Sequence, residues 1–392
     1  MQVDPFSANF RRDPYAVYRY LRETDPVHRC ANGAWIITRY ADVRAALTDS
    51  RLVHWTSDGN APTQFQRILS RWVRLMDPRN TTHLRALVAK AMSPGVLETL
   101  RPEVEQMLSE CLENMERNGK MDVVADLAEP LALSINSRLL GVPRDERVYF
   151  QQLARNLMGG IFQVVDGRTG NGAGDPLQSF CAYVLQLVER KRHNPGNDLI
   201  SAILSAQAKG DDIGTEDYLA FFTIFLFAGQ ENMMNSIGNG ILALIRHPQQ
   251  WQLLRNQPEL QRNAVEELLR YDSPVQFVAL IAREGLELGG QSIGPGESLL
   301  VSIGSANHDP AQFQKPEQLD ITRDPNPHLT FGAGALYCIG AALARLEGGM
   351  AIDTIVRRFE PLQIVGDSLQ WRSSPPILRG LSCLPVALGP HS

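Results

Sequence analysis

Cysteine is scarce in this sequence. Its 392 residues include only five cysteines, scattered at positions 30, 111, 181, 338 and 383. An odd number without paired spacing argues against a disulfide framework and against a structural zinc site. This usage is typical of a protein that works in the reducing cytoplasm.

Long hydrophobic runs are also absent. The most apolar stretch, Leu219 to Ala228, has about half of the roughly 20 residues that a membrane span requires. Charged residues at 216, 217 and 231 lie close to its two ends. The N-terminal segment has no apolar core behind its basic residues, so no signal peptide is predicted. A buried helix in a protein without membrane association explains the stretch better.

No basic tail or block is present either. Lys and Arg total 38 against 43 Asp and Glu, a formal net charge of -5, which makes nucleic acid an improbable partner. With 44% hydrophobic and 21% charged residues, the composition is that of a globular protein rather than a disordered, collagen-like or coiled-coil chain.

Helical patterns dominate the sequence. Thr215 to Arg246 predicts one helix of about 48 Å, ended by His247-Pro248. An Asn32-Gly33 turn predicts a hairpin, and the Gly-rich and Asp-rich segment Asp166–Asp175 predicts a mobile surface loop. The remaining predicted elements are helices over Tyr15–Arg22, Ala41–Leu47 and Glu259–Arg270, and strands over Val27–Arg29, Trp35–Thr38, Val275–Ile281, Leu286–Leu288, Leu299–Ile303 and parts of 362–386. We predict one domain, 1–392, mainly α with small β-sheets.

The segment from Phe331 to Arg345 carries the strongest chemical signal. It places Cys338 at the end of a glycine-punctuated loop, just before an alanine-rich helix. The N–H groups and dipole of a first helical turn favour negative sulfur. A lone cysteine at a loop–helix junction is more often a plain buried residue, but the glycine spacing favours a thiolate ligand here.

This segment resembles the cysteine loop of the cytochrome P450 family, Phe-x-x-Gly-x-x-x-Cys-x-Gly. The resemblance covers nearly the whole chain. Further matching motifs occur in the expected order: Met76-Asp77-Pro78 before Leu84-Arg85, Ala228-Gly229-Gln230-Glu231, Glu267-Leu-Leu-Arg270, Ser305 to Pro310, and Arg323 to Phe331. The chain is thereby identified as a soluble bacterial-type member, with the family's triangular helical prism and long central helix.

The resemblance implies roles for individual residues. Cys338 would be the axial thiolate of heme b (iron protoporphyrin IX), and Glu267, Arg270 and Arg323 would form a buried network that supports its loop. The haem-binding residues would be Arg85, Phe331, Gly332, Gly334 and Gly340, the oxygen-activating positions Ala228, Gly229, Glu231 and Asn232, and the substrate pocket Phe65, Phe221, Ile224, Phe277, Val278 and Ile377. Apolar residues at such spacings are, however, more often core.

Four positions depart from the family pattern. Thr81, Leu280 and Leu336 stand where a histidine, an arginine and a histidine commonly bind the haem propionates. Burying unpaired carboxylates is costly. The propionates are therefore solvated or paired with residues at other positions, or the protein binds haem with reduced affinity. A further alternative is a working protein without haem. In the long helix Asn232 replaces the usual threonine, and an amide is a poorer proton relay than a hydroxyl.

Three functions are compatible with this pattern. The leading hypothesis is a haem-thiolate monooxygenase for a small, largely apolar natural product, acting as a monomer with a ferredoxin and its ferredoxin reductase. The second keeps haem but performs peroxide-driven, coupling or redox-neutral chemistry, and Asn232 motivates it. The third is a haem-poor helper of a partner enzyme, motivated by the three departed propionate positions.

Overall fold

The structure is a computed structural model that describes residues 4–5, 7–54, 67–68, 70–72, 85–90, 92–165, 174–208, 214–366, 369–373 and 375–389. By their internal contacts, the residues fall into two units. The first comprises Met1–Trp55, Glu103–Ala128 and Asn232–Ser392, and the second comprises Thr56–Pro102 and Glu129–Glu231.

Among the described residues, all the strands and most of the helices belong to the first unit. Its helical elements are α1 (Ala8–Arg12), α2 (Tyr15–Thr24), α3 (Tyr40–Thr48), α7 (Arg101–Asn118), η1 (Val123–Ala128), α13 (Pro248–Asn256), η3 (Pro258–Leu260), α14 (Gln261–Tyr271), α15 (Ile303–Ala306), η4 (Gly334–Leu336) and α16 (Ala341–Arg358). Its strands are β1 (Val27–Arg29), β2 (Trp35–Ile37), β3 (Leu52–His54), β4 (Lys120–Asp122), β5 (Phe277–Ala282), β6 (Leu286–Leu288), β7 (Gln291–Ile293), β8 (Ser298–Ser302), β9 (Gln363–Ile364), β10 (Gln370–Trp371), β11 (Leu381–Cys383) and β12 (Pro385–Ala387).

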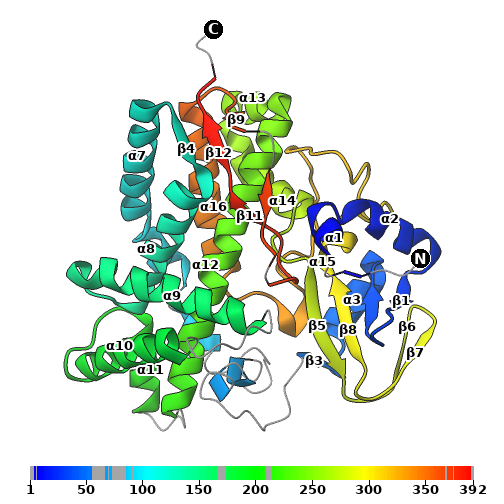
Figure 1. Ribbon diagram of the computed structural model, residues 1–392, viewed down its shortest axis with the longest axis horizontal. Coiled ribbons are helices and arrows are strands. Elements are labelled where there is room, and N and C mark those ends of the chain that lie inside the picture. Colours follow the sequence, from blue (N-terminus) through cyan, green and yellow to red (C-terminus); the bar gives the residue numbers. More distant parts are fainter. Residues whose placement is uncertain are drawn as a thin grey trace. The chain divides into compact units, whose positions relative to one another are not determined.

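The largest sheet has the strand order β1-β2-β8-β5-β3. Strand β2 pairs with β8 in parallel, and every other pairing in this sheet is antiparallel. The long strands β5 and β8 run side by side (Figure 1). The predicted hairpin is confirmed: β1 and β2 flank a turn in which Gly33 has φ +85°, a conformation that glycine adopts without steric cost.

Alternating side chains of this sheet fill two apolar layers. Ile36 and Leu300 face a cluster that Phe10, Tyr18 and Leu21 of the N-terminal segment complete. Their neighbours in β2 and β8 face a second cluster on the opposite side, which is covered by α3. This period of two is what a strand buried on both faces requires.

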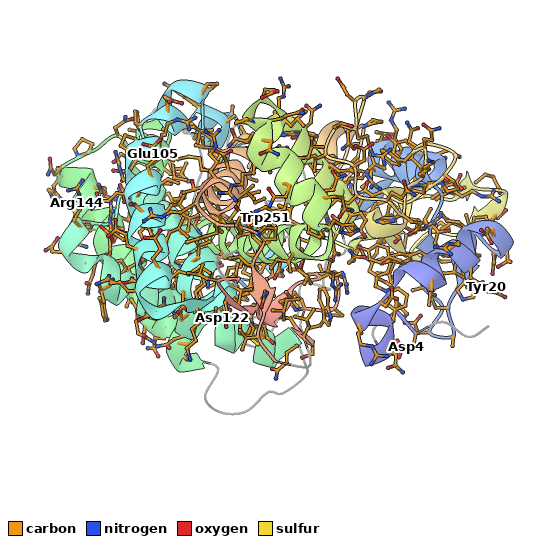
Figure 2. All side chains as sticks on the ribbon, turned by 90° about the horizontal axis from the view of Figure 1, so that it is seen from above. Asp4, Tyr20, Glu105, Asp122, Arg144 and Trp251 are labelled. Carbon is orange, nitrogen blue, oxygen red and sulfur yellow. The ribbon has the colours of Figure 1, made fainter. Side chains whose placement is uncertain are left out.

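Helices α13, α14 and α16 pack together in the same unit. Trp251 of α13, labelled in Figure 2, is fully buried. Its indole N–H donates to the carbonyl of Phe359 at 3.2 Å, so a polar group that burial would otherwise leave unpaired is satisfied.

The second unit is helical, apart from its loops, in the residues described. Its elements are α6 (Pro94–Glu98), α8 (Glu129–Leu140), η2 (Arg144–Glu146), α9 (Arg147–Val165), α10 (Gly174–His193) and α11 (Leu199–Gln207). Helices α9 and α10 pack against each other, and the rings of Phe150 and Phe180 lie 5.9 Å apart between them. The predicted loop at 166–173 lies outside the described residues.

Helix α12 runs from Thr215 to Arg246 and contributes residues to both units. Its 32 residues confirm the predicted bounds. The mainly α fold with small sheets is likewise confirmed. The helix predicted over Glu259–Arg270 begins instead as a 3-10 turn, η3, before α14. Among the helices of the described residues, none is long and apolar enough to span a bilayer.

Candidate active site

A short hydrogen-bonded loop presents Cys338. The backbone N–H of Cys338 donates to the carbonyl of Phe331 at 2.7 Å, and inside that closure the 3-10 turn η4 occupies Gly334–Leu336. Helix α16 then begins at Ala341, with Gly340 at its N-cap. The cysteine therefore sits directly before a helix N-terminus, as the sequence predicts.

Two glycines make this tight loop sterically feasible. Gly332 has φ +74°, and a Cβ there would lie 2.7 Å from the carbonyl oxygen of Leu336. Gly334 has φ +58°, and its Cβ would meet the methyl group of Thr48 on α3 at 2.9 Å. Both positions exclude larger residues through conformation and space.

The side chain of Cys338 is exposed. A Cβ at Gly340 would lie 3.8 Å from its sulfur, at ordinary contact distance. Within the part of the chain that the structure describes, no group of three or more His, Cys, Asp or Glu side chains could hold a metal ion. Cys338 therefore offers a single soft sulfur donor on an open face, which suits an axial ligand better than a closed metal site.

Glu267 is the centre of a buried charge network. Its carboxylate accepts two hydrogen bonds from Arg270, both of 2.8 Å, and one from the Nε of Arg323 at 3.0 Å. The Nδ2 of Asn326 donates to it at 3.1 Å, and the backbone N–H of Asp320 at 3.0 Å. The structure thus brings together the three charged residues that the sequence analysis grouped.

This network reaches the cysteine loop through Asn307. Arg270 donates from Nη1 to the carbonyl of Asn307 at 2.8 Å. The side chain of Asn307 accepts from the N–H of Leu329 and donates to the hydroxyl of Thr330. Since Leu329 and Thr330 directly precede Phe331, the buried ion pair positions the loop that carries the sulfur.

A second network on the same loop was missed by the sequence analysis. Glu266 accepts two hydrogen bonds from Arg345, at 2.6 and 2.8 Å, and it lies 3.0 Å from the Nε2 of His328. The Arg345 guanidinium also stacks over the ring of Phe331, with its Cζ 4.4 Å from the centroid. Helices α14 and α16 are thereby joined across the segment before the cysteine.

Acid should weaken this second network. Burial alone would raise the pKa of Glu266, but hydrogen bonds from Arg345 and His328 outweigh it and lower the pKa from 4.5 to about 2. A carboxyl group whose pKa is lower in the folded than in the unfolded protein stabilises the fold at pH values above the unfolded-state pKa. We therefore expect Glu266 to contribute up to roughly 3 kcal/mol to the free energy of unfolding at neutral pH. This contribution should be lost as the pH falls from about 4.5 to about 2. Urea unfolding of the wild type and of Glu266→Gln at several pH values in this range measures the difference in their unfolding free energies. If this difference does not shrink as the pH falls, Glu266 does not stabilise the fold through its lowered pKa.

Ala228 and Gly229 lie on α12. Ala228 is exposed, and Gly229 packs against α8, where a Cβ would meet the Oδ1 of Asn136 at 2.5 Å. Thr215–Arg246 is α-helical throughout, including these two residues.

The acid–amide pair of α12 follows on the next turn. Glu231 is buried, at 2% exposure. Asn232 is half-buried, and no described residue donates a hydrogen bond to its buried Oδ1. An oxygen in this state needs a water or a ligand as its donor.

The positions that depart from the family pattern differ in their surroundings. Leu280 is 1% exposed within the apolar cluster under the large sheet, whereas Leu336 is only half-buried at the edge of that cluster. Arg85 lies half-buried in the helical stretch 85–90. Thr81 lies outside the described residues.

The predicted substrate-pocket residues are not all brought together. Phe277 and Ile377 contact the apolar cluster of Phe10 and Tyr18, and the 1%-exposed ring of Phe277 is part of that core. Val278 points to the other face of the sheet. Phe221 and the half-buried Ile224 lie along α12, and Phe65 falls outside the described residues.

Comparison with known proteins gives a consistent result. The family model described as "Cytochrome P450" matches residues 14–374. The polyketide biosynthesis cytochrome P450 PksS of Bacillus subtilis (strain 168) is 35% identical, with 99% of each chain covered. The 6-deoxyerythronolide B hydroxylase of Saccharopolyspora erythraea is 34% identical, with 97% of this chain and 98% of that protein covered. The crystal structure of CalO2 aligns over 100% of both chains with a TM-score of 0.88 and 32% identity.

Proposed function

The chain belongs to the cytochrome P450 family, and from this premise we propose that it inserts one oxygen atom from O2 into a small, largely apolar natural product. As a family member it is a P450 monooxygenase, an oxidoreductase whose relatives tailor bacterial secondary metabolites. The family's cofactor is haem. We take heme b as the form used, in a single catalytic domain working as a monomer in the cytoplasm.

The observation that carries the proposal is the exposed thiol of Cys338 at the start of α16. Cys338 would ligate the iron, and the loop glycines Gly332 and Gly334 would keep the backbone clear of the porphyrin. A thiolate-ligated haem supplies oxygen activation, because the sulfur donates electron density that favours O–O cleavage. The chain itself would hold the sulfur in place through the Glu267 and Glu266 networks.

The names of two relatives support a substrate class. PksS is named for polyketide biosynthesis, and the second relative hydroxylates 6-deoxyerythronolide B. We propose a polyketide-like or similarly apolar substrate for this chain, lined on α12 by Phe221 and Ile224. A ferredoxin and its ferredoxin reductase would supply the two electrons.

An absorption spectrum tests the proposal. The reduced protein with carbon monoxide should show the red-shifted Soret band of thiolate-ligated haem, and substrate should accelerate NADPH consumption when a ferredoxin and its reductase are added. A colourless protein would instead support the haem-poor helper. A haem protein that turns over only with peroxide, or without net redox change, would support the alternative chemistry that Asn232 motivates.

Haem retention should rise in the variant Leu336→His. Arg85 is the one basic residue retained at the family's usual propionate positions, and a half-buried imidazole at 336 would add a donor for a carboxylate. We expect a roughly tenfold slower transfer of haem to apomyoglobin, corresponding to about 1.4 kcal/mol.

Leu280→Arg is the matched comparison for that variant. It would place a charge inside the apolar cluster that contains Leu280, so it should destabilise the fold instead of tightening haem. Unchanged haem transfer in Leu336→His would mean that other groups already pair with the propionates.

A further inference from the structure

A cleft in the first unit shares no lining residue with the cysteine loop. Its volume is about 670 Å³, which lies within the range of about 300–1,000 Å³ that is typical of small-molecule pockets. Its lining includes residues of the N-terminal segment, the last residues of α12 and α14, and the segment around β10, all of them in the first unit. The two networks that hold the cysteine loop do not contribute to it, so the proposed function leaves this cleft unexplained.

A buried ion pair forms one wall of the cleft. The carboxylate of Asp272 accepts hydrogen bonds of 2.7 Å from the Nε of Arg379 and from the hydroxyl of Tyr15. Arg379 is only 8% exposed, and its Cζ lies 3.6 Å from the ring centroid of Trp371. The Nδ2 of Asn239 donates to the backbone carbonyls of Asp272 and Arg379 at 3.2 and 3.1 Å, which joins this wall to α12. The wall is therefore formed, and its charges are paired, before any ligand binds.

The other acidic side chains of the cleft are also stabilised by the protein itself. Glu317 lies 3.1 Å from the Nη2 of Arg19 and 3.4 Å from the Nδ1 of His308. His308 does most to lower the pKa of Glu317, from 4.5 to about 2, and Arg19 adds to the effect. Asp13 accepts a hydrogen bond of 3.3 Å from the backbone N–H of Tyr15, at the start of α2, where the helix dipole favours a negative charge.

Two arginines of the cleft have no acidic partner. Arg12 ends α1 and Arg246 ends α12, and both are exposed. Within the described part of the chain, neither side chain forms an ion pair. Because other cations already neutralise Asp272 and Glu317, these two arginines are opposed by Asp13 alone. The cleft therefore presents positive charge to a ligand, through guanidinium groups whose geometry matches a carboxylate.

The rest of the lining includes aromatic and apolar side chains. Tyr15, Tyr271 and Trp371 are each half-buried, so each leaves surface on which a ligand can pack. The half-buried side chains of Ile364 and Leu369 extend this surface. Aromatic side chains favour flat partners, against which their rings stack offset or edge-on. A ligand that uses both kinds of contact combines an aromatic ring with a carboxylate.

We propose that this cleft is a binding site for a small aromatic carboxylate. The carboxylate accepts hydrogen bonds from Arg12 and Arg246, and the ring packs against Tyr15, Tyr271 and Trp371. No bond of the ligand is made or broken there. The site is an addition to the proposed oxygenation, because its lining includes neither Cys338 nor the residues that hold the cysteine loop.

Isothermal titration calorimetry of the full chain with three probes tests the class of ligand. Benzoate has both the ring and the charge, benzamide has the ring without the charge, and acetate has the charge without the ring. We expect benzoate to bind and benzamide to bind about tenfold more weakly, because it loses the charge-assisted hydrogen bonds. Acetate should also bind about tenfold more weakly, because it makes no contact with the aromatic side chains.

Two variants and a matched control test the location. Arg12→Gln and Arg246→Gln should each weaken benzoate binding about tenfold, and both should fold like the wild type because the arginines are exposed. Arg262→Gln is the control, since Arg262 is likewise exposed but lies on α14 outside the cleft. Its affinity for benzoate should equal that of the wild type. A crystal structure with benzoate should place the carboxylate at the two arginines.

Four results would overturn the proposal. They are no detectable binding of benzoate, equal affinity for the three probes, unchanged binding in both cleft variants, and a crystal structure with benzoate at another site. Calorimetry requires neither haem nor turnover. A protein that binds benzoate in the cleft but fails the carbon monoxide spectrum would therefore contradict the proposed function alone, and an active oxygenase that does not bind benzoate would contradict this proposal alone.

Discussion

Replacing Cys338 with alanine is expected to abolish the red-shifted carbon monoxide band and all oxygenation. Alanine offers the iron no ligand, and it keeps the backbone hydrogen bonds of residue 338 with Phe331 and Ala341. Since the side chain is exposed, the unfolding free energy of the apoprotein should change by no more than about 0.5 kcal/mol. Spectra of the reduced protein and urea unfolding measure the two effects separately.

Two further variants sharpen this prediction. Cys338→Ser keeps a ligand of similar shape but replaces soft sulfur with hard oxygen, so any haem that it binds should lack the red-shifted band. Cys383→Ala, in β11 and partly buried, is the control and should leave the spectrum unchanged. A red-shifted band in Cys338→Ala would show that another residue ligates the iron.

Glu267→Gln is expected to cause the largest loss of stability among the substitutions considered. Glu267 and Arg270 are both fully buried, and the carboxylate also accepts from Arg323. Removing its charge leaves two guanidinium groups without their counter-ion, a change that typically costs about 3–5 kcal/mol. Urea unfolding should show a loss of this size, and haem retention should fall with it because the network positions the cysteine loop.

Asp353→Asn is the matched comparison for Glu267→Gln. Asp353 pairs with Arg357 one turn along α16 at 2.8 Å, and the arginine side chain is 51% exposed. An exposed pair of this kind contributes at most about 1 kcal/mol. Equal losses of unfolding free energy in the two variants would mean that burial is not the reason why the Glu267 network stabilises the fold.

Local sequence patterns were sufficient to predict many of the elements. The long helix α12 has the predicted bounds because His247-Pro248 ends an otherwise continuous helical pattern. The hairpin is equally local, since a glycine with positive φ permits its turn. The grouping of Glu267, Arg270 and Arg323 came from the family motifs, and the hydrogen bonds agree with it.

The features that could not be predicted from the sequence depend on contacts between distant residues and on the face of a strand to which a side chain points. Glu266 meets Arg345 across 79 positions and His328 across 62, and no local pattern brings such residues together. The available signal was the pair of adjacent glutamates on α14 with an arginine on α16. Phe277 and Val278 were assigned to one pocket, but neighbouring strand residues point to opposite faces, and Phe277 joined the core.

The adjacent carboxylates of α14 limit where this chain can tolerate insertions and deletions. Glu266 and Glu267 point to different partners, yet both secure the approach to the same sulfur. Inserting or deleting one residue before them would turn the pair by about 100° around the helix axis and remove both anchors at once. Length variation among descendants of this sequence should therefore accumulate in surface loops, while the span from Gln261 to Tyr271 keeps its length.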